Sequence, residues 1–503
     1  MSDQFQQGST VTNPVIPGFH PDPSVCRVGD DYYLACSSFE YFPGIPLFHS
    51  RDLVNWTQIG NALDRPSQLR LPRDMPSSAG IYAPTLRHHD DLFWLIVTNV
   101  GDDGTMLFTA TDPAGPWSDP VRLPGVPGID PDLAWDEDGT CWCTVAGILQ
   151  VRIDPHTGET FGEPHRLWSG TPGALAPEAP HLYRIGPYWY LLIAEGGTER
   201  GHGVSIARGP TPCGPFEPCP ANPILTHRGT AHPIQNTGHA DLVQAPDGSW
   251  WMVLLGVRPH GGTPGWHVLG RETFLAPVEW VDGWPVAGEL SPQLPTPAWP
   301  LHPGPTTPVR DDFDHTELRS HWISVRERPE RLCATKERPG WLTLHAVGAS
   351  LDENDAVFVG RRQQHLACRA RTLIDPADGR GGLAVRLDEE HHYEIEAATG
   401  EVTVFARIGS LRAEVASRPS PAKGVVLGVE LTPAPPRGPL TGPDTLSFGI
   451  EEPDGTFTAL GALDGRYLST EVAGGFTGRA IGMYAATGTV HFDWFDYVPL
   501  SDT

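Results

Sequence analysis

The stretch DPDLAWDEDGTCWCTVA, residues 130–146, alternates apolar and polar residues, turns at Asp138-Gly139, and then alternates again. Such alternation is typical of a β-strand with one buried face. Asp-Gly supplies the positive φ values that tight hairpin turns require. The stretch therefore predicts a β-hairpin that begins at a small or acidic residue and ends in an aromatic-rich strand.

The same design occurs four more times in the first 260 residues. The other copies are DPSVCRVGDDYYLACSS from Asp22, APTLRHHDDLFWLIVTN from Ala83, APHLYRIGPYWYLLIAE from Ala179 and HADLVQAPDGSWWMVLL from His239. Successive starts lie 61, 47, 49 and 60 residues apart. Antiparallel units repeating every ~40 to 60 residues are typical of propeller blades, so five units predict a five-bladed β-propeller.

The remainder of the chain predicts a second all-β domain. With 503 residues the chain is too long for one ordinary core, and it has no long apolar run at helical period. The proline-rich stretch at 291–308 reads as a stiff linker. We therefore predict a propeller over 1–290, a linker over 291–308 and a β-sandwich over 309–503, where alternating strands continue without the repeat.

Charge and cysteine content exclude several classes of function. A formal net charge of -26 disfavours nucleic acid and anionic membrane partners but is compatible with a neutral sugar. The eight cysteines are sparse, and Cys141 and Cys143 lack a second pair at zinc spacing, which favours buried thiols. The polar N-terminus shows no signal peptide, so a cytoplasmic location is expected.

Three carboxylates are expected to meet in the central channel. Asp22 and Asp130 start the first and third repeats, and Glu178 precedes the start of the fourth. Equivalent positions of different blades converge on the channel, and neighbouring carboxylates raise one another's pKa, as acid-base chemistry requires. A lone Asp-Pro is otherwise typical of a turn. Pro21 and Pro23 predict an extended backbone at Asp22.

At this point the chain resembles glycoside hydrolase family 43, specifically its β-xylosidase and α-L-arabinofuranosidase branch. The resemblance covers nearly the whole chain and rests on the order and spacing of several motifs. These are NPVIPGFHPDPS, SSFEYFPG, HSRDLVNW, GIYAP, GIDPDL, PEAPHLY, AEGGT, GHADLV and LGRETFLAPVEW. In the C-terminal part, ERPGWLTLHA and FDWFDYVPL resemble the concanavalin-like β-sandwich of the xylosidase branch, which implies that fold for residues 309–503.

The resemblance implies roles for the three carboxylates. Matched motif by motif, Asp22 would be the general base, Glu178 the general acid, and Asp130 the group that orients the acid and tunes its pKa. An inverting glycosidase needs one ionised and one protonated carboxyl group on opposite sides of the scissile bond. Asp132 is a rival for the third role, but Asp130 starts its repeat as Asp22 does.

The resemblance also implies substrate contacts, each with a structural alternative. Arg271 would contact substrate or form a buried salt bridge with a carboxylate. His239 would bind substrate, or a calcium ion through water, or be a core histidine bonded to Asp241 or the backbone. Phe39 and Tyr82 would line the sugar ring, although many relatives carry Trp where Tyr82 stands. Phe476 would come from a sandwich loop or be a core residue.

The expected activity is that of an inverting exo-glycosidase that acts on xylo-oligosaccharides or arabinoxylan. It would release β-D-xylosyl or α-L-arabinofuranosyl units from non-reducing ends or side chains, with no required cofactor and a structural calcium ion as an option. A retaining fructosidase-like enzyme is disfavoured, because its Asn-Asp-Pro-Asn-Gly start is replaced by HPDPS at 20–24. The alternatives are an inactive sugar-binding propeller, a scaffold for protein partners and a hydrolase of another pentose-containing glycan. The sequence leaves homo-oligomer formation open.

Overall fold

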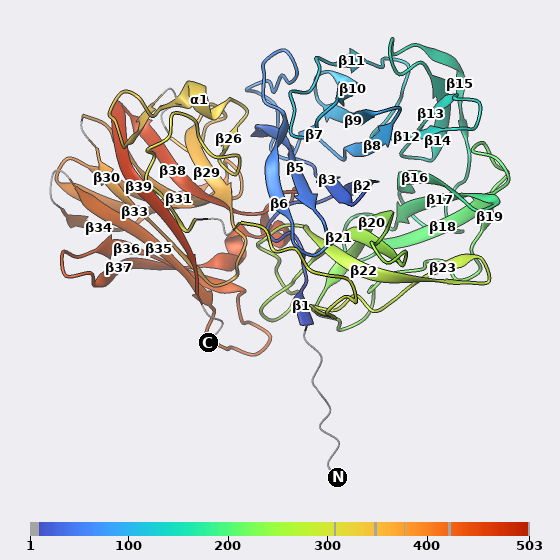
Figure 1. The fold of residues 1–503 in the computed structure, drawn as a ribbon. Helices are drawn as coiled ribbons and strands as arrows, with labels where there is room; N and C mark the ends of the chain where they lie inside the picture. The colour runs from blue at the N-terminus through green and yellow to red at the C-terminus, as the bar shows by residue number, and fades with distance from the viewer. Residues whose placement is uncertain (1–9, 306–307, 347–349, 377, 421–423, 501–503) are drawn as a thin grey trace.

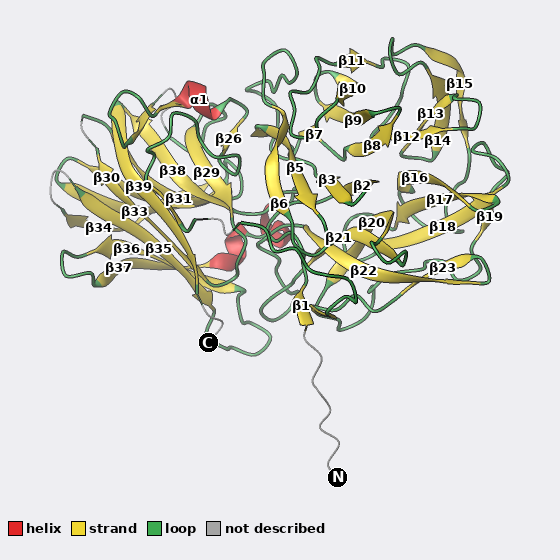
Figure 2. Cartoon of the chain, in the orientation of Figure 1, coloured by secondary structure: helices red, strands yellow, loops and turns green. Residues whose placement is uncertain are grey.

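The computed structural model describes residues 10–305, 308–346, 350–376, 378–420 and 424–500. Two lobes lie side by side (Figure 1), and both consist almost entirely of strands (Figure 2). The described helices are one turn long: α1 (Pro329–Leu332), η1 (Gly465–Leu468) and α2 (Thr470–Ala473). No helix in the described ranges has the length and apolar character needed to cross a membrane.

The first lobe is a five-bladed propeller, which confirms the prediction from the repeats. Each blade is an antiparallel sheet of neighbouring strands, and in the second blade the first two strands both pair with the third. The first blade contains β2 (Ser24–Val28), β3 (Asp31–Ala35), β5 (Gly44–Ser50) and β6 (Thr57–Leu63), and the second contains β7 (Gly80–Ile81), β8 (Thr85–His89), β9 (Leu92–Val100), β10 (Gly104–Ala110) and β11 (Val121–Arg122). The third contains β12 (Asp132–Trp135), β13 (Cys141–Val145), β14 (Leu149–Ile153) and β15 (Thr160–Arg166), and the fourth contains β16 (Glu178–Ile185), β17 (Tyr188–Glu195), β18 (Gly203–Gly209) and β19 (Glu217–Pro218). The fifth contains β20 (Gln235–Gln244), β21 (Trp250–Val257), β22 (Glu272–Val281) and β23 (Trp284–Ala287).

The proline-rich segment packs along the propeller. Its strand β24 (Gln293–Pro295) pairs antiparallel with β1 (Thr10–Thr12), so the two flanks of the propeller are joined. Trp299 is buried against the first blade, where its indole N–H donates to the Asp52 carbonyl at 3.0 Å. Residues 306–307 of the predicted linker lie outside the described residues.

The second lobe is a β-sandwich of two eight-stranded sheets, as predicted. One sheet contains β25 (Arg310–Asp311), β27 (Cys333–Ala334), β28 (Leu342–His345), β30 (Cys368–Asp375), β35 (Val425–Pro433), β36 (Asp444–Glu451), β37 (Phe457–Asp464) and β39 (Thr489–Pro499). The other contains β4 (Tyr41–Phe42), β26 (Ile323–Val325), β29 (Val357–Arg362), β31 (Arg380–Arg386), β32 (His391–Ala398), β33 (Glu401–Ile408), β34 (Leu411–Pro419) and β38 (Ala480–Thr487).

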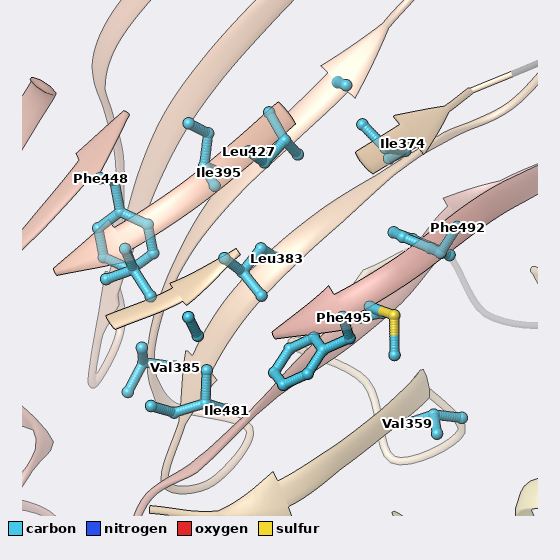
Figure 3. Packing of buried hydrophobic residues seen from close by; sticks show 14 of the residues in the cluster. Val359, Ile374, Leu383, Val385, Ile395, Leu427, Phe448, Ile481, Phe492 and Phe495 are labelled. Atoms are coloured by element: carbon cyan, nitrogen blue, oxygen red, sulfur yellow. The ribbon is translucent and has the colours of Figure 1, made fainter. Parts of the chain in front are cut away.

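The core of the sandwich lies between its two sheets. Leu383 and Ile395 of one sheet pack toward Leu427 and Phe492 of the other (Figure 3), and all four side chains are fully buried. Burying such a side chain stabilises the fold by about 1.5–3 kcal/mol. The alternation of apolar residues in these strands therefore forms a core of its own, separate from the propeller.

The two lobes share a β-sheet as well as a surface. The propeller strand β4 pairs antiparallel with β26 at the edge of the sandwich, with Tyr41 opposite Val325. Arg326 of the sandwich donates its Nε–H to the Met75 carbonyl and its backbone N–H to the Glu40 carbonyl of the propeller, both at 2.8 Å. Because β4 begins two residues after the pocket residue Phe39, this pairing fixes the sandwich next to the mouth of the central channel.

Candidate active site

A shared backbone kink brings the repeat starts to the mouth of the channel. Asp22, Asp130, Ala179 and His239 have φ values of +55°, +54°, +50° and +48°, in the left-handed region. At the last two, the pairing of the innermost strand with its neighbour is also shifted, as in a β-bulge. Such kinks re-aim side chains at strand ends, so groups from different blades point into one pocket.

The kink corrects the prediction of an extended backbone at Asp22. The flanking prolines favour extended geometry, but Asp is among the residues that tolerate the left-handed region. The carboxylate of Asp22 accepts hydrogen bonds from Ser37 Oγ at 2.5 Å and Arg271 Nη1 at 3.0 Å. These tertiary contacts hold the strained conformation against the local preference.

Asp22 is buried and held as a carboxylate. Burial alone would raise its pKa, but the Arg271 guanidinium and the hydrogen bond from Ser37 favour the charged form, and the pKa lies below the usual range. Arg271 Nη2 makes a second, longer contact of 3.5 Å with the other oxygen of Asp22. The group is therefore ionised at neutral pH and able to accept a proton from water.

Asp130 and Glu178 lie in the same pocket with raised pKa values. Burial, and then the charge of Asp22, raises the pKa of Glu178 to about 7. Burial, and then the charge of Glu178, raises the pKa of Asp130 well above its usual value. The Ala179 N–H donates to Asp130 Oδ2 at 3.2 Å and favours the ionised form of Asp130. Both carboxyl groups therefore hold a proton more readily than a free carboxyl group does.

Arg271 connects the base to both lobes. Besides Asp22, its Nη1 donates to Thr198 Oγ1 at 3.0 Å, and its Nη2 lies 3.5 Å from the Phe476 carbonyl oxygen. Its Nε is buried without a hydrogen-bond partner among the described residues. The buried salt bridge that was the alternative to a substrate contact is present. Its partner is Asp22, the candidate base, so Arg271 affects the active site under both interpretations.

His239 contacts Asp22 in the channel and is neutral. Its Nδ1 lies 3.5 Å from Asp22 Oδ1, and burial lowers the pKa of His239 to about 3. Calcium prefers about six to eight oxygen ligands. In the described ranges no three His, Cys, Asp or Glu side chains are arranged to hold a metal ion.

The floor of the channel is a buried ion network centred on Arg87. Arg87 Nη2 donates to Asp132 Oδ1 at 2.7 Å, and Nη1 donates to Asp241 Oδ2 at 3.0 Å. Both carboxylates are fully buried. Asp132 is therefore bound in the floor and does not line the pocket, whereas Asp130 does. The geometry favours Asp130 over its rival, and the contact of His239 is Asp22 rather than Asp241.

Three aromatic rings form one wall of the pocket. Phe39 and Phe476 stack with centroids 6.0 Å apart, and Tyr82 meets their edges at 5.7 and 5.9 Å. Aromatic faces provide apolar surface for a ligand while polar groups set its orientation. Phe39, Tyr82 and Phe476 were each predicted from the sequence, and the structure brings all three together.

Phe476 reaches the pocket from the sandwich on a loop fixed by the propeller. Its backbone N–H donates to Ser78 Oγ at 2.9 Å, and the Arg479 N–H donates to the Val268 carbonyl at 3.1 Å. Nearby, Glu471 accepts from the His267 backbone N–H at 2.9 Å. The loop thus covers one side of the pocket.

Replacing Phe476 with alanine is expected to raise KM for a small glycoside at least about tenfold, the lower end of what one altered hydrophobic contact contributes. The reason is loss of the aromatic wall with the loop still held by backbone contacts. Steady-state kinetics and a melting curve check this, with the exposed Phe161→Ala as control. A lower Tm with unchanged KM would make Phe476 a core residue only.

Sequence reasoning missed three groups that surround the carboxylates: Ser37, Thr198 and His202. His202 Nδ1 faces the Asn236 carbonyl at 3.1 Å and therefore carries the proton, which leaves Nε2 directed at Glu178 Oε1, 3.9 Å away. A Cβ at Gly238 would lie 2.3 Å from the His202 ring, so only glycine admits this histidine. A single histidine in a loop gives no spacing signal that could have revealed it.

The pocket has the size of one sugar ring, and a further cavity of about 300 Å³ adjoins it along Thr198, Glu199, Arg271 and Phe476. Its volume is about 230 Å³, below the ~300–1,000 Å³ typical of pockets for drug-sized ligands. Asp22, Asp130 and Glu178 line it together with Arg271 and Phe476. An ionised acceptor, a carboxyl group with a pKa near neutrality and an aromatic wall thus surround a cavity of monosaccharide size.

Comparison with known families gives two matches that together span most of the chain. Residues 11–285 match the family described as Glycosyl hydrolases family 43. Residues 310–498 match the beta xylosidase C-terminal concanavalin A-like domain. The first range contains all five blades except the end of the last strand, and the second contains the sandwich strands after the linker.

Similar proteins match over nearly their whole length. The chain is 41% identical to a non-reducing end alpha-L-arabinofuranosidase of Bacteroides ovatus, over 97% of this chain and 94% of that protein. It is 36% identical to a xylosidase/arabinosidase of Butyrivibrio fibrisolvens, covering 96% and 98%. The solved structure of a xylan beta-1,4-xylosidase from Bacillus halodurans aligns with a TM-score of 0.88 at 32% identity, covering 97% of this chain and 100% of that one.

Proposed function

The chain belongs to glycosyl hydrolases family 43, and from that premise we propose that it is an inverting exo-glycosidase that removes single pentose units. The units are β-D-xylosyl or α-L-arabinofuranosyl groups at the non-reducing ends or side chains of xylo-oligosaccharides and arabinoxylan. The observation that carries the proposal is the meeting of Asp22, Asp130 and Glu178, from three blades, in one pocket that also contains Phe476 from the sandwich.

In the proposed reaction Asp22 removes a proton from a water molecule that attacks the anomeric carbon. Glu178 donates its proton to the glycosidic oxygen as that bond breaks. Arg271 keeps Asp22 ionised, and Asp130 accepts a hydrogen bond from the Ala179 N–H and so holds the backbone next to Glu178 in place. Attack from the face opposite the leaving group inverts the anomeric configuration.

The choice of sugar is tested by measuring turnover of nitrophenyl β-D-xyloside and nitrophenyl α-L-arabinofuranoside side by side. Relatives carry both names, xylosidase and arabinofuranosidase, and the two sugars place similar hydroxyls in similar positions. We expect at least one substrate to be hydrolysed, with the anomer of the first product inverted relative to the substrate. Retention of configuration, or no turnover of either, would reject the proposal and favour a binding module or another pentose-containing glycan.

A structural calcium ion, bound through water near His239, is proposed only as an addition to this function. Because the described residues form no protein cage for it, we expect chelation with EDTA to leave turnover unchanged. A ligand bound only to the folded state raises Tm. A Tm that falls on chelation and returns with calcium would show a structural ion, and an unchanged Tm would remove it. A cytoplasmic location remains a prediction in the same way.

A further inference from the structure

A second, larger cavity lies between the propeller and the sandwich. Its volume is about 480 Å³, and it shares no lining residue with the catalytic pocket. Phe48 and Trp56 of the first blade line it on one side. Arg361 and Arg362, at the end of β29 in the sandwich, line it on another.

Arg362 is a buried cation for which the described residues offer no hydrogen-bonding partner. Its residue is 4% exposed, and its Nε and Nη2 make no hydrogen bond within the described part of the chain. Its guanidinium lies over the Phe19 ring at 4.6 Å, which satisfies none of its N–H groups. Leaving a buried charge unpaired is costly, so these donors indicate a ligand.

Neighbouring basic groups add unmet donors to the same cavity. Arg361 donates from Nη2 to Gln364 at 2.6 Å, but its Nε is buried without a partner in the described ranges. Arg319, which also lines the cavity, has a buried Nη1 in the same condition and only a 3.7 Å contact from Nε to Asp311. Three guanidinium groups therefore line the cavity, whereas the carboxylate of Asp311, which lies near Arg319, is not among the lining residues.

The two histidines that line the cavity have lowered pKa values, in part because of the positive charge around them. Burial and then the Arg362 charge lower the pKa of His20. Burial, Arg361 and Arg319 lower the pKa of His321 to about 3. Among the described residues that line the cavity there is no aspartate or glutamate. In a chain with a formal net charge of -26, the three arginines of this cavity form a local excess of positive charge.

We propose that this cavity binds a small oxyanion, either phosphate or the carboxylate of a sugar acid, through Arg361 and Arg362. A guanidinium presents paired N–H donors that match the oxygens of a carboxylate or phosphate. Phe48 and Trp56 provide an apolar wall against which a sugar ring can pack. The bound anion would connect the sandwich strand β29 to the first blade and so stabilise the contact between the two lobes.

Thermal unfolding at constant ionic strength tests the proposal. Tm is measured in sodium chloride, with part of the salt replaced by phosphate or D-glucuronate, or with added uncharged D-glucose. We expect a saturable rise in Tm with an oxyanion and none with glucose, since a ligand of the folded state stabilises it. A rise with phosphate and D-glucuronate alike means that the oxyanion alone is recognised. A rise with D-glucuronate only identifies a sugar acid.

Variants show whether the cavity is the site. Arg362→Gln, or Arg361→Gln if the first does not fold, should abolish the rise, whereas Arg70→Gln removes an exposed charge far from the cavity lining and should retain it. The same rise in the arginine variants, or no rise in the unmodified protein, would overturn the proposal. So would competitive inhibition of glycoside turnover with a constant equal to the midpoint of the Tm response, which places the anion in the catalytic pocket.

Discussion

Asp22→Ala is expected to lower kcat for both nitrophenyl glycosides by roughly 10² to 10⁴-fold, the usual contribution of a positioned acid or base. The variant lacks the carboxylate that Ser37 and Arg271 jointly hold in the pocket. Water bound there then has no adjacent acceptor for its proton. The measurement is steady-state release of nitrophenol, with the exposed Asp119→Asn as a control that should match the unmodified protein.

Loss of activity alone would not distinguish a missing base from a disturbed pocket, because Arg271 loses its partner in Asp22→Ala. Asp22→Asn keeps an oxygen that can accept from Arg271 but cannot take a proton, so we expect it to be as inactive as the alanine variant. Azide is an anion that needs no base, and it should restore nitrophenol release in Asp22→Ala by forming a glycosyl azide of inverted configuration. Activity in Asp22→Asn near that of the unmodified protein would contradict the role of base.

The propeller could be predicted because each blade carries its own local pattern. The alternation in residues 130–146 and its turn at Asp138-Gly139 specify one hairpin, and five copies specify the architecture. The channel follows from the symmetry of that architecture, so Asp22, Asp130 and Glu178 could be placed together before any distance was known. Phe476 is different, because only the family resemblance connected a sandwich loop to this pocket.

The parts that were not predicted depend on contacts between distant segments. Asp22 has a left-handed backbone and accepts a hydrogen bond from Arg271, 249 residues away, whereas its neighbouring prolines favour an extended backbone. His202 reaches Glu178 because Gly238, on another blade, leaves room for its ring. Arg87 gave no signal in its repeat, yet it binds Asp132 and Asp241 from two other blades. Rules based on neighbouring residues do not predict interactions that form only when the blades pack against one another.

The charge on Glu178 should set the alkaline limit of activity. The pKa of Glu178 is raised to about 7, so the protonated acid is lost, and kcat/KM falls, as pH rises through that value. The pKa of Asp22 is lowered, so the ionised base is lost only well into the acid range. We expect a pH profile that is flat in weakly acid solution and declines above about pH 7, measured with nitrophenyl β-D-xyloside or α-L-arabinofuranoside.

Glu178→Gln should remove that alkaline decline and lower kcat in a way that depends on the leaving group. Xylobiose needs a proton on its departing oxygen, so its turnover should fall by about 10² to 10⁴-fold. Nitrophenolate departs with little help, so the aryl glycoside should lose much less. The exposed Glu163→Gln should change neither rate. Equal losses for the two substrates would contradict the assignment of Glu178 as the acid.

Glu199 offers an independent test of why the pKa of Glu178 is raised. Burial and the Asp22 charge are the main causes, and the Glu199 charge at the rim adds to them. Glu199→Gln removes that repulsion, so the alkaline decline should move to lower pH, while the rate on the acid side of the decline is largely kept. If the decline disappears in Glu178→Gln, Glu178 is the titrating acid. If the decline also stays at the same pH in Glu199→Gln, the raised pKa of Glu178 is due to burial and Asp22 alone. A decline that persists in Glu178→Gln would belong to another group, for which Asp130, with its own raised pKa, is the first candidate.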